Sequence, residues 1–257
     1  MVASPQRKVC EMNHTKIEWD RNQDGSQGFT SNPVRGECPV GCLYCYVKPF
    51  RVRYGWHKDI RFYPSELEAI SKRKKPAGIF VGSTIELFHD KTIQYMPEIM
   101  DIIRDCPQHR FYLLTKQPQN LSKFSPFPDN VYLGVSATNQ HQFDEAVKYL
   151  KEVEAKVKYI SFEPLLNWWD TATSDMVAKS LKVAGVNWVI IGAQTKPYKP
   201  PKIEWVQEIV QACDKAKIPV FLKDNLRPLL NQHRVWEWEW AISPNRKLRQ
   251  EVPRCVS

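Results

Sequence analysis

No apolar run in this sequence is long enough to span a membrane, and its N-terminus lacks the pattern of a secretory signal peptide. These two absences favour a protein that makes no contact with a membrane. Cys106 and Cys213 are typical of reduced thiols in or near a core, which favours a reducing cytoplasm. The sequence also lacks internal repeats and low-complexity segments. Its 257 residues suffice for one large α/β domain with a well-buried core.

A fourth cysteine is missing beside the tightest group of cysteines. Cys38, Cys42 and Cys45 form a C-x3-C-x2-C motif, and the rest of the seven cysteines are scattered along the chain. In a reducing cytoplasm, soft thiolates this close together favour metal binding over disulfide formation. A 4Fe-4S cluster normally takes four cysteine ligands, so three would leave one iron open. An open coordination position is typical of a catalytic metal site.

The cysteine motif, with Tyr44 directly before its last cysteine, resembles the signature of the radical S-adenosylmethionine (SAM) enzymes. Further segments, spread over most of the chain, resemble one uncharacterised, phage-associated three-cysteine family to which no substrate is assigned. These segments are Lys16–Trp19, Asn32–Gly36, Cys45–Tyr46, Phe80–Ser83, Leu113–Lys116, Leu133–Ser136, Phe162–Leu165 and Leu222–Asn225.

The resemblance implies both cofactors and chemistry. In the radical SAM superfamily, three cysteines hold a 4Fe-4S cluster whose open iron binds the amino and carboxylate groups of SAM. An electron from the cluster cleaves the bond between sulfur and C5′, and the resulting 5′-deoxyadenosyl radical takes a hydrogen atom from the substrate. The implied partners are therefore SAM, an electron donor such as flavodoxin or ferredoxin, and a substrate.

Short β-branched apolar runs alternate with amphipathic stretches along the chain. The runs are residues 78–81, 110–114, 131–135, 157–162, 188–191 and 219–222, and the helical stretches cover roughly 92–105, 140–152, 173–183 and 202–216. This alternation predicts βαβ units and a parallel sheet. The spacing fits a partial or near-complete TIM-like (β/α) barrel, with the cluster loop after the first strand. We expect a lead-in over 1–27, the barrel over 28–230 and an aromatic, basic extension over 231–257.

Polar or ionisable side chains follow each of the predicted strands. The carboxyl ends of parallel strands share one rim of a barrel, so we expect many of these side chains to form one site there. Others are expected to cap helices or to satisfy backbone groups. The residues are Ser83, Glu86, Thr115, Lys116, Ser136, Thr138, Asn139, Glu163, Gln194, Lys223, Asp224 and Asn225.

The resemblance implies a role for most of these residues. Tyr44 would line the adenine side of SAM, because an aromatic face gains by stacking on a purine. Gly82, Ser83 and Glu86 follow the strand that meets the SAM ammonium in the superfamily, although the usual two glycines and a glutamate in succession are not matched here. Ser136 and Asn139 follow a later strand, where the superfamily binds the ribose hydroxyls of SAM. The chemistry of the remaining residues, and not the resemblance, suggests Glu163 as a further acceptor, Lys116 and Lys223 to orient an anionic substrate, and Asp224 as a proton acceptor or partner of Lys223.

The net charge of +9 favours an anionic partner such as DNA, RNA or a nucleotide. Two stretches combine cations with aromatic rings, which suits phosphate contact together with base stacking. The first stretch contains Arg51, Arg53, Tyr54, Trp56, Lys58 and Arg61, and it can also be a solvated helix with a few anchoring aromatics. The second stretch is either a lid over the barrel mouth or a packing extension. It contains Trp236, Trp238, Trp240, Arg246, Lys247, Arg249 and Arg254.

Two other classes of protein compete with a radical SAM enzyme. A nucleic-acid-binding protein without catalysis would use the cysteines for structural zinc, with Cys10, His14 or His57 as the fourth ligand. A barrel glycosidase would use Glu86 and Glu163 as its acid and nucleophile, but this leaves the three cysteines unexplained. The identity of the bound metal separates these alternatives.

Overall fold

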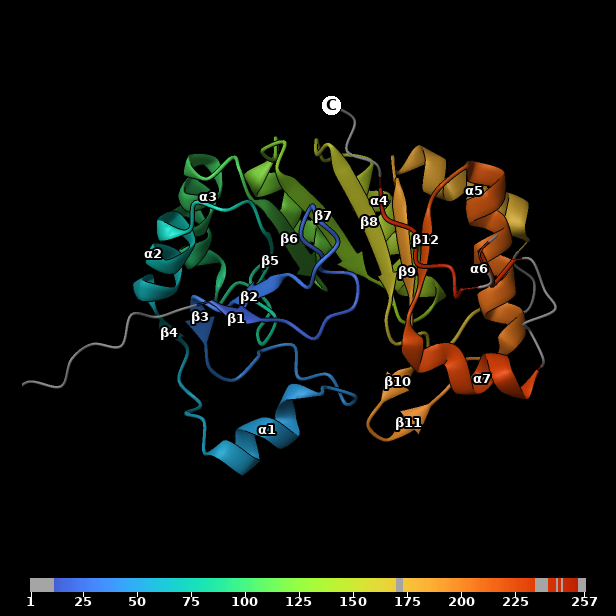
Figure 1. Cartoon of the computed structure of the whole chain (residues 1–257), viewed down its shortest axis with the longest axis horizontal. Helices are drawn as coiled ribbons and strands as arrows, with labels where there is room; N and C mark the ends of the chain where they lie inside the picture. The colour runs from blue at the N-terminus through green and yellow to red at the C-terminus, as the bar shows by residue number, and fades with distance from the viewer. Residues whose placement is uncertain (1–11, 170–172, 234–239, 244, 246, 254–257) are drawn as a thin grey trace, which may run out of the picture.

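The computed structural model describes residues 12–169, 173–233, 240–243, 245 and 247–253 (Figure 1). One large sheet has the strand order β1-β2-β5-β6-β7-β8-β9-β12. β1 pairs antiparallel with β2, and every other neighbouring pair is parallel. The strands are β1 (Asn13–His14), β2 (Phe29–Ser31), β5 (Gly78–Val81), β6 (Arg110–Thr115), β7 (Val131–Ser136), β8 (Val157–Phe162), β9 (Trp188–Ile191) and β12 (Val220–Leu222).

The sheet is open within the described part of the chain. β1 and β12 are its two edges, and no pairing between strands joins them. The predicted mixed α/β fold with a large, mostly parallel sheet is therefore confirmed, whereas a closed barrel is not observed. The parallel strands follow one another in chain order, as expected when each crossover leads to the adjacent position.

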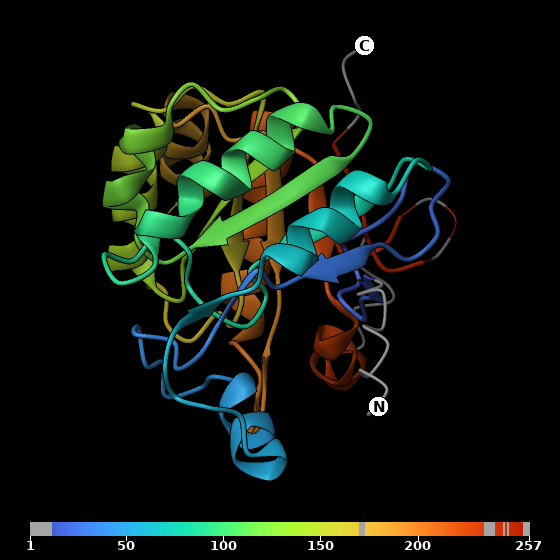
Figure 2. The ribbon, with the colours of Figure 1, turned by 90° about the vertical axis from the view of Figure 1, so that its left-hand side faces the viewer.

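Five helices pack against one face of this sheet (Figures 1 and 2). Leu113 and Leu133 of the sheet share a core there with Ile99, Phe143 and Val206 of the helices. The four amphipathic stretches predicted from the sequence correspond to helices α3, α4, α5 and α6. None of the described helices is both long and apolar enough to cross a membrane. The helices are α2 (Pro64–Lys72), α3 (Met96–Asp105), α4 (Gln140–Leu150), α5 (Ser174–Val183) and α6 (Ile203–Ala216).

Smaller elements complete the described chain. Helix α1 and the hairpin β10–β11 lie beyond the carboxyl ends of the parallel strands, at the bottom of the view (Figure 1). Their bounds and those of the remaining elements are α1 (Val47–Tyr54), β10 (Gln194–Thr195), β11 (Tyr198–Lys199), β3 (Val34–Arg35), β4 (Arg61–Phe62), α7 (Arg227–Gln232) and the 3-10 helices η1 (Ile93–Tyr95), η2 (Pro118–Phe124) and η3 (Asp224–Leu226).

Aromatic side chains fill the amino-terminal half of the other face of the sheet. A Cβ atom on Gly134 would lie 2.2 Å from the ring of Tyr159. Only glycine at this position therefore leaves room for that ring to lie over β7. The second buried cluster that results is here called the aromatic floor. It consists of Trp19, Phe80, Tyr112, Tyr132, Tyr159, Trp188 and Phe221, with Val157 and Ile190 beside them.

Residues 12–27 are held against the sheet by this floor. Trp19 is 2% exposed, and Ile17 packs against the same cluster. The backbone of this segment also bonds to itself and to the start of β2, as in the hydrogen bond of 3.0 Å from Thr15 N–H to the carbonyl of Gly28. Ile17 and Trp19 thus tie the lead-in down.

The described part of the C-terminal extension covers the β12 edge. Leu222 N–H donates to the carbonyl of Arg249 over 2.8 Å, and Trp188 Nε1–H donates to the carbonyl of Glu251 over 2.9 Å. Arg249 itself forms an ion pair of 2.9 Å with Asp214. These contacts are those of a packing extension. Trp236, Trp238, Arg246 and Arg254, named above for an aromatic, basic surface, lie outside the described residues.

Asp20 offers a test of how deeply residues 12–27 are buried. Burial raises the pKa of this carboxyl to about 8, although the guanidinium groups of Arg110 and Arg21 lower it. Between about pH 4 and pH 8 the unfolded chain therefore releases a proton that the folded chain retains, and the free energy of unfolding falls as the pH rises. Asp20→Asn cannot ionise, so urea unfolding should show it gaining stability over wild type at pH 8 and little at pH 4. Equal differences at both pH values would contradict the burial of an ionisable Asp20.

Candidate active site

A cavity of about 370 Å³ lies at the carboxyl ends of the parallel strands. It is called the central cavity below. All the residues that were given a role in the predicted site line it except Asn139 and Asp224. Those that line it are Cys38, Cys42, Tyr44, Cys45, Gly82, Ser83, Glu86, Lys116, Ser136, Glu163 and Lys223.

The alternation of side chains along each strand explains why these polar groups meet. Residues two apart on a strand point to the same face of the sheet. Tyr132 and Ser136 of β7 therefore share the inner face, as do Tyr159 of β8 and Glu163 just beyond its end. The aromatic residue lies at the amino end and the polar residue at the carboxyl end. The central cavity thus has polar walls above an apolar base, which includes Trp19, Phe80 and Leu114.

The cysteine loop is fixed to the rim of the sheet by hydrogen bonds. Burial raises the pKa of the Cys38 thiol, and the backbone N–H groups of Glu86 and Val40 oppose this shift. Tyr46 O–H donates to the carbonyl of Ser83. Asn32 Oδ1 accepts from the Ser83 hydroxyl over 3.1 Å and holds the loop after β5 in place. The loop and the strand ends therefore form one continuous wall.

The three thiols of the loop are free and face the same cavity. Among the described residues, no group of three His, Cys, Asp or Glu side chains is arranged to hold a metal ion. Thiolates repel one another and draw together only around the cation that they bind. The donor chemistry, with three soft ligands from one short loop at the mouth of a cavity, fits an iron–sulfur cluster with one open iron.

Glu86 is buried and its carboxylate is fully engaged by the protein. One oxygen accepts from the Thr115 hydroxyl over 2.7 Å and from Phe88 N–H over 3.0 Å. The other oxygen accepts from Lys116 N–H over 2.8 Å. Glu86 therefore clamps the loop after β5 to the end of β6, which positions Lys116.

Glu163 and Lys223 form an ion pair across the cavity wall. Their side chains are 26% and 13% exposed. Burial lowers the pKa of Lys223, but the carboxylates of Glu163, Glu18 and Asp224 outweigh it and hold this pKa above its ordinary value. Lys223 is thus a fixed cation at the cavity.

Lys116 is the second cation of the cavity wall. Burial lowers its pKa, and the nearby Cys42, Glu86 and Glu163 oppose this shift. Its Nζ atom lies 5.6 Å from the centre of the Tyr44 ring, which is a cation–π contact. Burial, followed by the charge of Cys42, raises the pKa of Tyr44. Lys116 therefore links the cysteine loop to the strand ends by charge and by ring contact.

Two predicted site residues lie away from the central cavity. The side chain of Asn139 caps helix α4 by accepting a bond of 3.0 Å from Gln142 N–H. The carboxylate of Asp224 pairs with Arg227 Nε over 2.8 Å. The carboxylate partner of Lys223 is Glu163, which sequence reasoning did not pair with it.

The two histidines considered as fourth zinc ligands are engaged elsewhere. The ring of His14 lies against that of Phe29, with 4.2 Å between ring centroids and 32° between ring planes. The ring nitrogens of His57 lie 2.7 Å from the carbonyl of Asp59 and 2.8 Å from the Tyr63 hydroxyl. Neither histidine lines the central cavity. Cys10 lies outside the described residues.

Sequence reasoning gave no role in the site to Lys16, Ile17 or Trp19, although all three line the central cavity. Thr195 at the base of the β10–β11 hairpin was missed as well. The only signal for the first three was their place in a segment that resembles the three-cysteine family. Their contact with the cavity depends on the packing of Trp19 on strands far along the chain, which no local pattern encodes.

The chain belongs to a family of proteins of unknown function, DUF5131, whose model matches residues 14–228. This range includes the whole sheet apart from Asn13, all three motif cysteines and every described residue of the central cavity. No curated protein matches the chain significantly.

Proposed function

We propose that this chain is a radical SAM enzyme in which Cys38, Cys42 and Cys45 hold a 4Fe-4S cluster and the central cavity holds SAM. One observation carries the proposal: the three thiols of one short loop and the inward-facing polar groups of β6, β7, β8 and β12 line the same cavity. The open sheet, with helices on one face and this cavity at its carboxyl ends, is compatible with a partial TIM-like barrel.

When bound, the cluster and SAM would supply a 5′-deoxyadenosyl radical that takes a hydrogen atom from the substrate. The residues of the chain would bind and orient SAM and the substrate, and would exclude water from the cavity. Trp19 and Phe80 of the aromatic floor form part of the base of the cavity. Ser136 and Glu163 offer oxygen acceptors to the hydroxyl and ammonium groups of SAM. Glu86, whose oxygens are occupied, acts by positioning Lys116.

The proposed substrate is anionic, either a nucleic acid or a nucleotide. Lys116 and Lys223 place two cations at the cavity, and Lys16 adds a third at its edge. The net charge of +9 supports the same class of substrate. An electron donor such as flavodoxin or ferredoxin completes the reaction as a proposed partner.

Anaerobic reconstitution with iron and sulfide tests the proposal. The protein should turn brown, bind about four irons per chain and, once reduced, convert SAM to 5′-deoxyadenosine and methionine. The conversion is followed by chromatography. A colourless protein with one zinc per chain would support a binding protein instead, and a metal-free hydrolase of glycosides would support the third class.

Ser136 and Asn139 make a matched pair for testing the SAM site. Ser136→Ala removes a hydroxyl from the cavity wall and should weaken SAM binding by roughly two- to tenfold, the effect of one lost hydrogen bond. Asn139→Ala removes a helix cap and should lower the free energy of unfolding by about 1 kcal/mol. Equilibrium binding and urea unfolding measure the two effects. A loss of SAM affinity in Asn139→Ala alone would place the ribose beside α4 and contradict this assignment.

A further inference from the structure

Helix α1 and the residues after it expose an unusual number of large apolar side chains. Val52 is 86% exposed, Tyr54 59% and Trp56 47%. Phe50 and the hairpin residue Tyr198 are exposed as well. Side chains of this size normally lie in the core, so a group of them at one end of the molecule marks a surface for a partner.

Three rings of this surface form a stack. The centroids of Phe50 and Tyr54 are 6.4 Å apart with 12° between ring planes. Those of Tyr54 and Trp56 are 6.5 Å apart with 26° between planes. These three residues are called the ring stack below. Because the ring faces are nearly parallel, successive bases of a nucleic acid strand can stack on them.

Cations surround the ring stack. Residues 47–61 contain Lys48, Arg51, Arg53, Lys58 and Arg61 against the single acid Asp59, and residues 194–202 contain three lysines and no acid. Arg53 lies 5.6 Å over the ring of Tyr54, and Lys196 of the hairpin lies 5.1 Å over that of Phe50. Within the described residues, neither of these two cations forms an ion pair.

Arg51 is not one of the available cations. It pairs with Glu37 over 3.4 Å and its side chain is only 13% exposed. Arg61 similarly pairs with Asp59 over 3.2 Å. Arg53, Lys58 and Lys196 are exposed and form no ion pair with any described residue, so a partner can reach their charge.

The ring stack adjoins the central cavity. Tyr46 and Val47, at the start of α1, line that cavity, as do Gln194 and Thr195 at the start of the hairpin. The contact of Lys196 with Phe50 joins the two elements, and both views show α1 beside the hairpin at the carboxyl end of the sheet (Figures 1 and 2). A partner lying on the stack would thus reach the cavity mouth.

We propose that the ring stack and its cations bind a single-stranded polynucleotide, and that this strand presents one of its nucleotides to the central cavity. Bases would stack on Phe50, Tyr54 and Trp56, while phosphates would meet Arg53, Lys58 and Lys196. Presentation of a nucleotide to the cavity rests on the proposed radical SAM function, whereas binding of the strand does not. Because the recognised groups are bases and phosphates, DNA and RNA strands should both bind.

A single strand fits this surface better than a duplex or an anionic membrane. The bases of a duplex are stacked on one another and cannot cover protein rings. A membrane surface would take up apolar side chains without regard to the orientation of their ring planes, whereas here the planes are aligned and flanked by cations. The strand therefore accounts for both the aromatic alignment and the charge.

The test uses fluorescence anisotropy of a labelled twelve-nucleotide DNA strand with the full-length chain. Tyr54→Ala and Trp56→Ala should each weaken binding about five- to 150-fold, as expected for loss of one base–aromatic stack. The logarithm of the affinity should fall with the logarithm of the salt concentration with a slope of roughly −2, for three phosphate contacts. Both residues are exposed, so thermal unfolding should show both variants folded.

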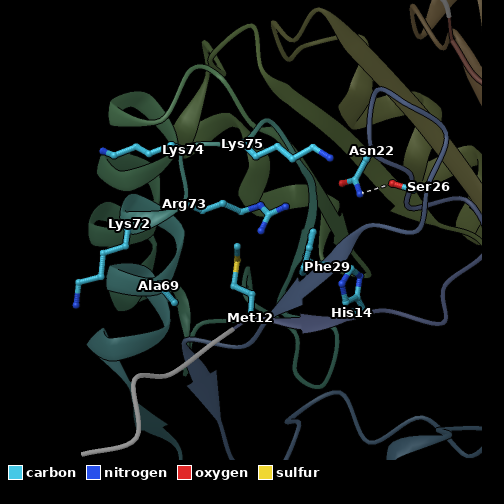
Figure 3. A pocket seen from close by; sticks show the side chains of 10 residues that line it. All are labelled: Met12, His14, Asn22, Ser26, Phe29, Ala69, Lys72, Arg73, Lys74 and Lys75. Atoms are coloured by element: carbon cyan, nitrogen blue, oxygen red, sulfur yellow. Dashed lines mark hydrogen bonds between the residues drawn. The ribbon is translucent and has the colours of Figure 1, made fainter.

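A second basic cavity provides the matched control for charge (Figure 3). It lies at the amino ends of β2 and β5 and is lined by Lys72, Arg73, Lys74 and Lys75. Three of these four cations are engaged: Arg73 lies 4.2 Å over the Phe29 ring, Lys75 pairs with Asp24 over 3.4 Å, and Lys72 pairs with Glu68 over 3.1 Å. Lys72 and Lys74 point away from Phe29 (Figure 3). Reversing both to Glu should leave strand affinity within about twofold, whereas Arg53→Glu with Lys58→Glu should abolish binding.

Tyr149 provides the matched control for the rings. It carries Lys148 at 4.9 Å over its ring, but at the carboxyl end of α4, away from the ring stack. Tyr149→Ala should bind the strand as wild type does.

Four results would overturn the proposal that the ring stack binds a single strand. They are no binding at low salt, equal losses of affinity in either control, a duplex that binds as tightly as the strand, and displacement of the strand from the protein by anionic lipid vesicles. Absence of SAM cleavage with intact strand binding would overturn the proposed reaction and the presentation of a nucleotide, but not strand binding.

Discussion

Replacing any one of Cys38, Cys42 and Cys45 with Ala is expected to abolish the proposed iron–sulfur cluster and the proposed cleavage of SAM. The three thiols come from one loop and line one cavity, so no other described cysteine can substitute for a lost ligand. A cluster that already has one open iron would then have only two protein ligands. Iron and sulfide content, the visible absorption spectrum and the yield of 5′-deoxyadenosine measure the loss.

Two other cysteines serve as controls for this experiment. Cys106 and Cys213 are buried in the core that the helices share with the sheet, and neither lines the central cavity. Cys106→Ala and Cys213→Ala should retain about four irons per chain, although each leaves a small cavity in the core. A variant without all three motif cysteines that still bound stoichiometric iron and sulfide would refute the assignment of the cluster.

Trp19→Ala is expected to lower the free energy of unfolding by about 3–5 kcal/mol, as in other truncations of large buried aromatic residues. Trp19 is 2% exposed, and its ring centroid lies 5.2 Å from that of Phe80 and 5.4 Å from that of Tyr112. Its ring centroid also lies 6.0 Å from that of Tyr159 and 6.1 Å from that of Trp188. The truncation would therefore open a void at the centre of the aromatic floor. Urea unfolding measures the loss.

The same substitution should also affect the site, because Trp19 lines the central cavity. We expect weaker SAM binding in the enlarged cavity. Trp56→Ala is the control for stability, since Trp56 is exposed and its truncation should change the free energy of unfolding by less than about 0.5 kcal/mol. A loss below about 1 kcal/mol in Trp19→Ala would show that residues 12–27 do not form part of the core.

Local patterns predicted most of the sheet. Each β-branched run named in the sequence became a parallel strand, and each of the four amphipathic stretches became a helix. Alternation of period two along a strand and of period 3.6 along a helix is written into a few consecutive residues, so it can be recognised without knowledge of the fold. The rule that parallel strands share a carboxyl edge then brought most candidate residues to one rim.

The same rule could not separate residues that face the cavity from neighbours that do not. Lys223 and Asp224 are adjacent, yet the first lines the cavity and the second starts a 3-10 helix and pairs with Arg227. Asn139 follows its strand as the other candidates do, but its local backbone makes it a helix cap. A short polar side chain after a strand can satisfy either role, and the turn geometry decides between them.

The sequence by itself determined the cysteine motif with its unfilled fourth position, the alternation of strands and helices, and the excess of basic residues. These are properties of residue type and spacing along the chain. Only the tertiary structure decided that Glu163 pairs with Lys223, that Trp19 supports the cavity from below, and that the β10–β11 hairpin meets α1 through Lys196 and Phe50. Each of these contacts joins residues far apart in the chain. Their meeting depends on strand order, register and the paths of the crossovers, which no local pattern specifies.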